Sequence, residues 1–128
     1  MRLACSKKLI NKRSNNLKDT IILVTHNGMG KADLALQHKL AAKYFELLLQ
    51  NTNPPAAICF YTEGVKLTVS DSPVLEQLKA LEAKGVRLII CSTCLDFYGL
   101  SGQTQVGIVG GMTDIIEAQT KAAKVITI

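Results

Sequence analysis

Short apolar runs recur along the chain at fairly regular intervals, and each is followed by polar or glycine-rich residues. Continuous runs of β-branched and other apolar residues are typical of strands that are buried on both faces of a sheet. We therefore predict five strands, at residues 20–25 (TIILVT), 56–62 (AAICFYT), 86–92, 105–109 and 125–128.

The segments between these runs have helical spacing of their apolar residues. A long helix is predicted over 33–50, where apolar side chains recur three and four residues apart. A second is predicted over 74–84, with Ser72 as its N-cap, Pro73 at its first position and Gly85 directly after its end. Shorter helical pieces are predicted over 95–100 and over 115–123, the latter capped by Thr113 and Asp114, while 65–69 reads as either a short strand or a helical piece.

Strands and helices alternate throughout residues 19–128, with no internal repeat and no second domain. Such alternation predicts an α/β fold with a parallel sheet, helices on both of its faces and right-handed crossovers. Ligands of these folds bind outside the carboxyl ends of the strands. The residues at those ends are 26–30, 62–64, 91–94 and 110–113.

The net charge of +5 is concentrated at the start of the chain. Residues 1–18 carry six basic side chains and no acidic one, so we interpret them as a basic tail or linker. Residues 19–128 carry nine basic and ten acidic side chains, and this balance gives no support to nucleic-acid binding by the folded domain.

No apolar run reaches the roughly 18 to 20 residues that a transmembrane helix needs, and the start of the chain does not resemble a secretory signal. The four cysteines, in a chain with this much apolar sequence, do not indicate a disulfide framework. We therefore expect a soluble, cytoplasmic protein with reduced thiols, no membrane partner and no cofactor.

Two of the cysteines, Cys91 and Cys94, lie where a buried strand passes into a helical turn. A thiol at a helix start is expected to have its pKa lowered from about 8.5, which favours the nucleophilic thiolate. Cys94 is therefore the candidate nucleophile, and Cys91 the more buried of the two. The pair suits thiol–disulfide exchange or persulfide chemistry, whereas metal binding would need two more ligands that the sequence does not place nearby. Alternatively, both are small buried apolar side chains.

Other residues at the same edge could line a pocket around the thiols. The loop of Asn27, Gly28, Met29 and Gly30 superficially resembles a phosphate loop, but it matches neither the Walker A pattern nor the dinucleotide fingerprint, because Asp33 replaces the third glycine. It is either a tight turn or a backbone rim of the site.

Several side chains at this edge also have both a functional and a structural interpretation. His26 could be a base or a solvated loop residue, and Lys66 could lower a thiol pKa or be solvated. Tyr98 is expected to pack at the sheet edge with its hydroxyl outward. Gly64 lies in a turn, and Gly110 and Gly111 permit either a close ligand contact or a plain turn.

Residues 91–100, CSTCLDFYGL, resemble the segment C-G-T-C-L-D-[FY]-Y-G-L of the DsrE/DsrF-like sulfur-relay superfamily, closest to the C-terminal domain of YedF-like selenium-metabolism proteins. Similar residues continue in 64–69, at Met29–Gly30 and towards the end of the chain, at Val106–Gly107, Met112, Ile115 and 124–126. Ser92 stands where glycine is usual, and Gly110–Thr113 also departs from the common pattern.

The resemblance implies a three-layer, Rossmann-like or flavodoxin-like sandwich with a mostly parallel five-stranded sheet. It further implies a homo-oligomer, a trimer or a multiple of it, and a sulfurtransferase-like role in which Cys94 or Cys91 carries sulfur or selenium as a persulfide. A small sulfur-carrier protein of TusA-like fold is the partner it suggests. Two alternatives stay open, a non-catalytic oligomeric binding module and a thiol–disulfide oxidoreductase.

Overall fold

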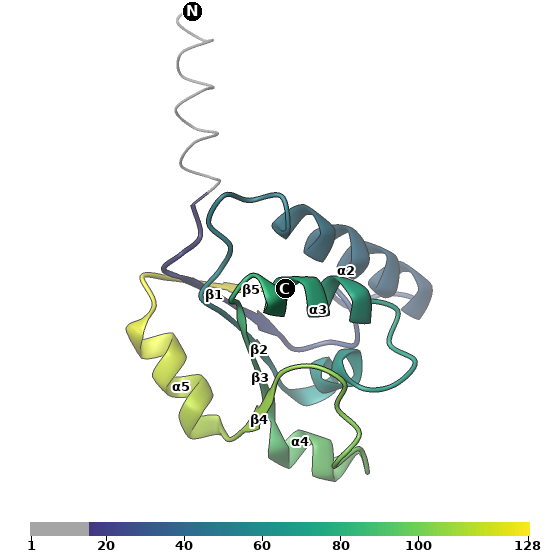
Figure 1. The fold of residues 1–128 in the computed structure, drawn as a ribbon. Helices are drawn as coiled ribbons and strands as arrows, with labels where there is room; N and C mark the ends of the chain where they lie inside the picture. The colour runs from purple at the N-terminus through teal and green to yellow at the C-terminus, as the bar shows by residue number, and fades with distance from the viewer. Residues whose placement is uncertain (1–15) are drawn as a thin grey trace, which may run out of the picture.

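The computed structural model describes residues 16–128, so most of the predicted basic tail lies outside the described part. A single five-stranded sheet forms its centre, with every strand parallel and in the order β4-β3-β2-β1-β5 (Figure 1). The strands are β1 (Thr20–Val24), β2 (Ala57–Phe60), β3 (Arg87–Cys91), β4 (Ile108–Gly110) and β5 (Lys124–Thr127).

The helices cover both faces of this sheet. They are α2 (Leu34–Leu48), the 3₁₀ helix η1 (Thr62–Thr68), α3 (Leu75–Ala83), α4 (Ser92–Phe97) and α5 (Met112–Lys121). Helices α2 and α3 pack together on one face, α5 lies on the other, and α4 follows the carboxyl end of β3 (Figure 1). The predicted three-layer α/β fold is therefore confirmed, and the sheet is parallel throughout.

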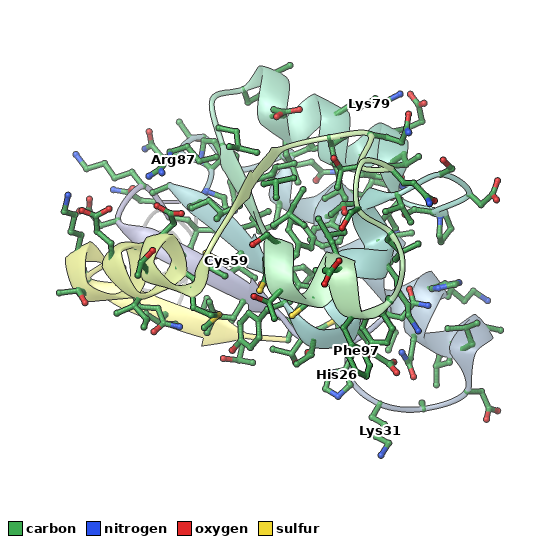
Figure 2. All side chains as sticks on the ribbon, turned by 90° about the horizontal axis from the view of Figure 1, so that it is seen from below. His26, Lys31, Cys59, Lys79, Arg87 and Phe97 are labelled. Atoms are coloured by element: carbon green, nitrogen blue, oxygen red, sulfur yellow. The ribbon has the colours of Figure 1, made fainter. Side chains whose placement is uncertain are left out.

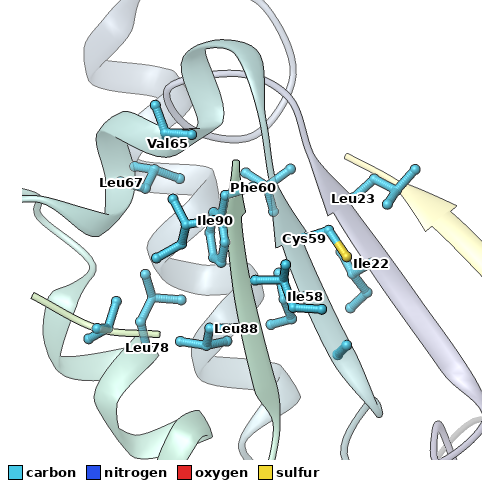
Figure 3. Packing of buried hydrophobic residues seen from close by; sticks show 14 of the residues in the cluster. Ile22, Leu23, Ile58, Cys59, Phe60, Val65, Leu67, Leu78, Leu88 and Ile90 are labelled. Atoms are coloured by element: carbon cyan, nitrogen blue, oxygen red, sulfur yellow. The ribbon is translucent and has the colours of Figure 1, made fainter. Parts of the chain in front are cut away.

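Strand composition explains why the sheet holds the core. The residues of β1 and β2 are buried throughout, because both strands lie between neighbours and between two helical layers. Charged side chains such as Lys31, Lys79 and Arg87 lie at the surface, whereas Cys59 is enclosed (Figure 2). On the face that α3 covers, Ile58, Phe60, Leu88 and Ile90 of the sheet lie close to Leu78 (Figure 3).

Three elements after β3 begin three residues away from their predicted first residues. Helix α4 begins at Ser92, three residues earlier than predicted, so Cys94 lies within it. Helix α5 begins at Met112, because the Asp114 carboxylate accepts the Gly111 N–H at 2.9 Å and so acts from the third helical position. Strand β4 begins only at Ile108, because Gly107 directly before it has a left-handed φ of +76°. Gly107 also packs closely against the backbone of β3.

The ends of α3 show one confirmed and one wrong prediction. Gly85 follows the helix with a φ of +97°, and the N–H of Val86 donates to the Leu81 carbonyl at 3.1 Å, which together form a Schellman ending. At the other end Ser72 is not the N-cap. Its hydroxyl accepts the N–H of Val74 at 3.3 Å, so the helix starts two residues later than Ser72 and Pro73 indicated.

The end of β1 and the helix η1 are packed unusually tightly. The Tyr61 N–H donates to the Val24 carbonyl at 3.1 Å, which joins the start of η1 to the end of β1. A Cβ atom at Gly64 would overlap the same Val24 carbonyl oxygen. Only glycine therefore allows η1 to lie against β1. This contact also sets the position of Thr62, which lies two residues before Gly64 on the same helix.

Within residues 16–128, none of the helices combines the length and apolar character that a membrane crossing requires.

Replacing Gly64 by alanine should destabilise the protein strongly. We expect a loss of roughly 3 kcal/mol in the free energy of unfolding, because the new methyl group meets backbone that cannot move independently. The matched control is Gly85→Ala, where a Cβ meets nothing within 4 Å and only the left-handed φ is unfavourable, so about 1 kcal/mol is expected. Chemical denaturation measures both. Equal losses in the two variants would contradict the close packing at Gly64.

Cys59 should make stability depend on pH above neutrality. Burial raises the pKa of this thiol to about 11, and the nearby Arg87 guanidinium opposes the rise only partly. Above about pH 9 the unfolded chain loses the Cys59 proton while the folded chain keeps it, so rising pH favours unfolding until the folded pKa is passed. We expect wild type to lose roughly 2 kcal/mol more than Cys59→Val over this range. Parallel pH profiles of the two proteins would contradict this.

Candidate functional site

The two paired cysteines lie at the carboxyl end of β3, in different surroundings. Cys91 is the last residue of β3 and the N-cap of α4, and it is 1% exposed. Cys94 is the third residue of α4 and is half-buried, and both are free thiols. The predicted difference in burial is therefore confirmed, and Cys94 is the thiol that a reactant can reach.

A backbone amide points at the Cys94 sulfur. The N–H of Thr62, the first residue of η1, donates to the Cys94 Sγ at 3.0 Å. Thr62 has a φ of +49°, in the left-handed region, and its hydroxyl donates to the Thr25 carbonyl at 2.6 Å. Residues 62–64 are predicted at the carboxyl edge of the sheet, but the pattern does not identify this role of Thr62, since threonine does not favour left-handed backbone.

The pKa of Cys94 is raised above its ordinary value, which makes the predicted lowering wrong. Burial is the largest cause, and the neighbouring Cys91 thiol raises the pKa further. The Thr62 amide acts in the opposite direction, because it donates to the sulfur. Helix α4 has only six residues, so little helix dipole opposes the burial. Cys94 is accordingly a protonated thiol at neutral pH.

A mostly apolar hollow of about 300 Å³ opens beside Cys94, lined by Thr62, Thr93, Cys94, Phe97 and Tyr98. Phe97 is 82% exposed, and its ring meets the Tyr98 ring edge-on with centroids 5.2 Å apart. The predicted site residue Tyr98 thus lies in this hollow. The Phe97 ring is therefore open to solvent beside the Cys94 thiol.

Lys66 reaches the same region from η1. Its ammonium lies 4.4 Å from the centroid of the Tyr98 ring and 4.0 Å from the Glu63 carboxylate. It therefore contacts a residue of the hollow rather than a thiol. Gly64, on the same helix, is buried beneath the end of β1.

The loop after β1 is attached to α2. The Asn27 carbonyl accepts a hydrogen bond from the Gln37 amide at 3.1 Å, and its side chain lies 3.3 Å from His38. Gly28 packs so closely on Gln37 that a side chain there would overlap it. Asn27 and Gly28 therefore hold the loop on the helix.

The remaining predicted site residues lie at the carboxyl end of β4 or on the loops that follow β1 and β4. The His26 ring pairs with the Thr25 hydroxyl at 3.1 Å, and His26 and Phe97 lie towards the same side of the molecule (Figure 2). Gly30 has a left-handed φ of +72° in a turn before α2. Gly110 pairs in register with Cys91, and Gly111 caps α5. The end of β4 is thus the immediate neighbour of the buried thiol.

Two further observations limit the chemistry of residues 16–128. Within this range there is no group of three or more histidine, cysteine or acidic side chains placed to hold a metal ion. A second hollow, of about 130 Å³, lies at the opposite, amino end of the strands, lined in part by Lys18, Arg87 and Lys121. It contains no thiol, so we place the candidate site at Cys94.

The fold and the site together define an α/β protein with a parallel sheet and a reachable cysteine at its carboxyl edge. The chain belongs to the DsrE/DsrF-like family, whose model matches residues 18–128. This is a sulfur-relay-related family. No protein with curated functional information matches the sequence.

Solved structures share the fold at low sequence identity. The YchN protein from E. coli is 20% identical, with a TM-score of 0.61 over 88% of this chain and 99% of its own. MTH1491 from Methanobacterium thermoautotrophicum, a protein of unknown function, is 19% identical, with a TM-score of 0.62 over 85% and 97%. BT1422 from Bacteroides thetaiotaomicron is 17% identical, with a TM-score of 0.58 over 86% and 95%. These similarities concern the fold.

Removing the Cys91 thiol should make Cys94 more reactive near neutral pH. Cys91 raises the pKa of Cys94, so Cys91→Ala should lower that pKa and increase the thiolate fraction. We expect alkylation of Cys94 by iodoacetamide at pH 7.5 to become roughly threefold faster, measured on the Cys94 peptide by mass spectrometry. Cys59→Ala, which removes a thiol from the core, is the control and should leave the rate unchanged. A slower reaction in Cys91→Ala would contradict this account.

Proposed function

We propose that this protein is a persulfide relay, in which Cys94 accepts a sulfur or selenium atom from one thiol and passes it to another. The observation that carries the proposal is the Cys94 sulfur itself, a free thiol beside an open hollow with a backbone N–H donating to it at 3.0 Å. Membership of a sulfur-relay-related family supports the same chemistry.

The proposed transfer is a thiolate displacement. Cys94 first loses its proton to solvent, and its thiolate attacks the terminal sulfur of a donor persulfide, R–S–SH. A bond forms between the Cys94 sulfur and that terminal sulfur, while the donor's S–S bond breaks and its electron pair leaves on R–S⁻, which is then protonated by solvent. An acceptor thiolate removes the terminal sulfur by the same step and releases the Cys94 thiolate.

The shape of the hollow supports a donor and an acceptor that are carried on proteins. It is open and mostly apolar, and its aromatic rings suit a polarizable sulfur atom. The exposed Phe97 offers a partner an apolar contact beside the thiol. A small sulfur-carrier protein of TusA-like fold is the partner we propose, in the cytoplasm, where thiols remain reduced.

A specific surface favours a second candidate function, that of a non-catalytic oligomeric binding module. Leu36, Leu40 and Leu47 lie along one side of α2 and are 47%, 43% and 51% exposed. Their spacing places them on one stripe of the helix, away from the buried face. Such a stripe is suited to contact between copies of this chain, and we propose a homo-oligomer, a trimer or a multiple of it, for either function.

Intact-mass analysis after incubation with a persulfide donor tests the proposed relay. We expect wild type to gain the mass of one sulfur atom, and the adduct to map to the Cys94 peptide. Cys94→Ser should abolish the adduct, whereas Cys59→Ser, which changes a buried thiol, should retain it. A low-molecular-weight acceptor thiol should then remove the added mass.

The following outcomes would decide against the relay. Wild type without an adduct, or an adduct that survives Cys94→Ser, would exclude Cys94 as the carrier. Oligomers and partner complexes unchanged by Cys94→Ser, with no adduct in wild type, would instead favour the binding module. Reversible formation of a Cys91–Cys94 disulfide with turnover of a disulfide substrate would indicate a thiol–disulfide oxidoreductase.

A further inference from the structure

We propose that Thr62 is the third residue of the Cys94 site: its hydroxyl anchors the Tyr61–Thr62 peptide group beside the end of β1, and this peptide group presents the N–H that stabilises negative charge on the Cys94 sulfur. This inference rests on the proposed relay and assigns a role to a residue outside the thiol pair. It is carried by three features of Thr62, which are its backbone angle, its hydroxyl contact and its amide contact.

The backbone of Thr62 is held in an unfavourable conformation. Its φ of +49° lies in the left-handed region, where a β-branched side chain is strained. Such strain persists only where the surroundings hold the residue in place. The Thr62 N–H belongs to the peptide group that joins Tyr61 to Thr62, and the Thr62 hydroxyl lies 2.6 Å from the carbonyl oxygen of that same group. The hydroxyl therefore contacts the peptide group that presents the N–H to Cys94.

Contacts on both sides of Thr62 hold this conformation. On one side of Thr62, the Tyr61 N–H donates to the Val24 carbonyl at 3.1 Å. Beyond it, Gly64 packs against the same carbonyl with no space for a side chain. Between these two points, the Thr62 hydroxyl lies 2.6 Å from the carbonyl oxygens of both Thr25 and Tyr61. The contact with Thr25 is the one that joins Thr62 to another segment, directly after β1.

The amide would act in both halves of the transfer. When Cys94 attacks a donor, its sulfur begins as the thiolate, and when it gives up the terminal sulfur it leaves as the thiolate. Charge therefore lies on the same Sγ atom in both steps, at 3.0 Å from the Thr62 nitrogen in the resting protein. A fixed donor at this atom favours both steps, because a hydrogen bond to a charged sulfur is stronger than one to a neutral thiol.

The experiment removes the hydroxyl and reads the reactivity of Cys94. We expect Thr62→Val, which keeps the shape of the side chain, to slow alkylation of the Cys94 peptide at pH 7.5 by roughly fivefold to tenfold. The midpoint of the alkylation pH profile should move upward accordingly. Thr62→Ser keeps the hydroxyl and should restore at least half of the wild-type rate. Thr120→Val is the matched control, because the Thr120 hydroxyl also donates to a backbone carbonyl, that of Ile116, but on α5 and outside the hollow, and it should stay within twofold of wild type.

The outcomes separate this inference from the relay itself, because alkylation needs no sulfur donor. A wild-type rate and pH profile in Thr62→Val would overturn the role of Thr62, even if Cys94 still forms a persulfide. Equal slowing in Thr62→Val and Thr120→Val would also overturn it, since the loss of a threonine hydroxyl outside the site would then have the same effect. A slowed Thr62→Val with no sulfur adduct on wild type would support the inference and reject the relay. Should Thr62→Val fail to fold, Thr62→Ala removes the same hydroxyl and is measured in its place.

Discussion

The close contact between the end of β1 and η1 is the constraint on which the candidate site depends. The Val24 carbonyl accepts the Tyr61 N–H, and Gly64 leaves no space between η1 and that carbonyl. The connection from β2 into η1 therefore has one position relative to β1. In the sheet β2 lies between β1 and β3, so this contact also sets the position of the residues after β2 relative to Cys94 at the end of β3. One of these residues is Thr62, whose backbone N–H donates to the Cys94 sulfur.

Two opposing effects act on the Cys94 sulfur, and their balance sets its state. Burial and the Cys91 thiol favour the protonated form, while the Thr62 amide favours the thiolate. The first two prevail, so the pKa is raised and the resting site is uncharged. The hollow beside Cys94 is mostly apolar and open, and it does not supply a compensating charge of its own. The amide is therefore the structural feature that makes the charged form accessible.

Alternation of apolar runs and helical segments was sufficient to predict the layers, because each element must bury one face against another layer. The alternation does not predict the order of the strands in the sheet, since it is compatible with several orders. Cys91 and Cys94 could be placed at the carboxyl edge from the strand that precedes them. Thr62 could not be found, because its role depends on a backbone angle that threonine does not favour and on a long-range contact with β1. The pKa of Cys94 was predicted in the wrong direction because burial and helix length are properties of the folded chain.

A thiol that both accepts and gives sulfur is subject to a compromise. As an attacking group it gains intrinsic nucleophilicity from a high pKa but loses thiolate, and as a leaving group it departs faster when its pKa is low. Cys94 has a raised pKa together with a fixed N–H donor, so burial preserves its nucleophilicity and the Thr62 amide stabilises it when it leaves. Cys91 acts against departure, because it raises the pKa of Cys94. Under the proposed relay, a partner covering the hollow would increase the burial of Cys94 and so make the Thr62 contact more important for release than for capture.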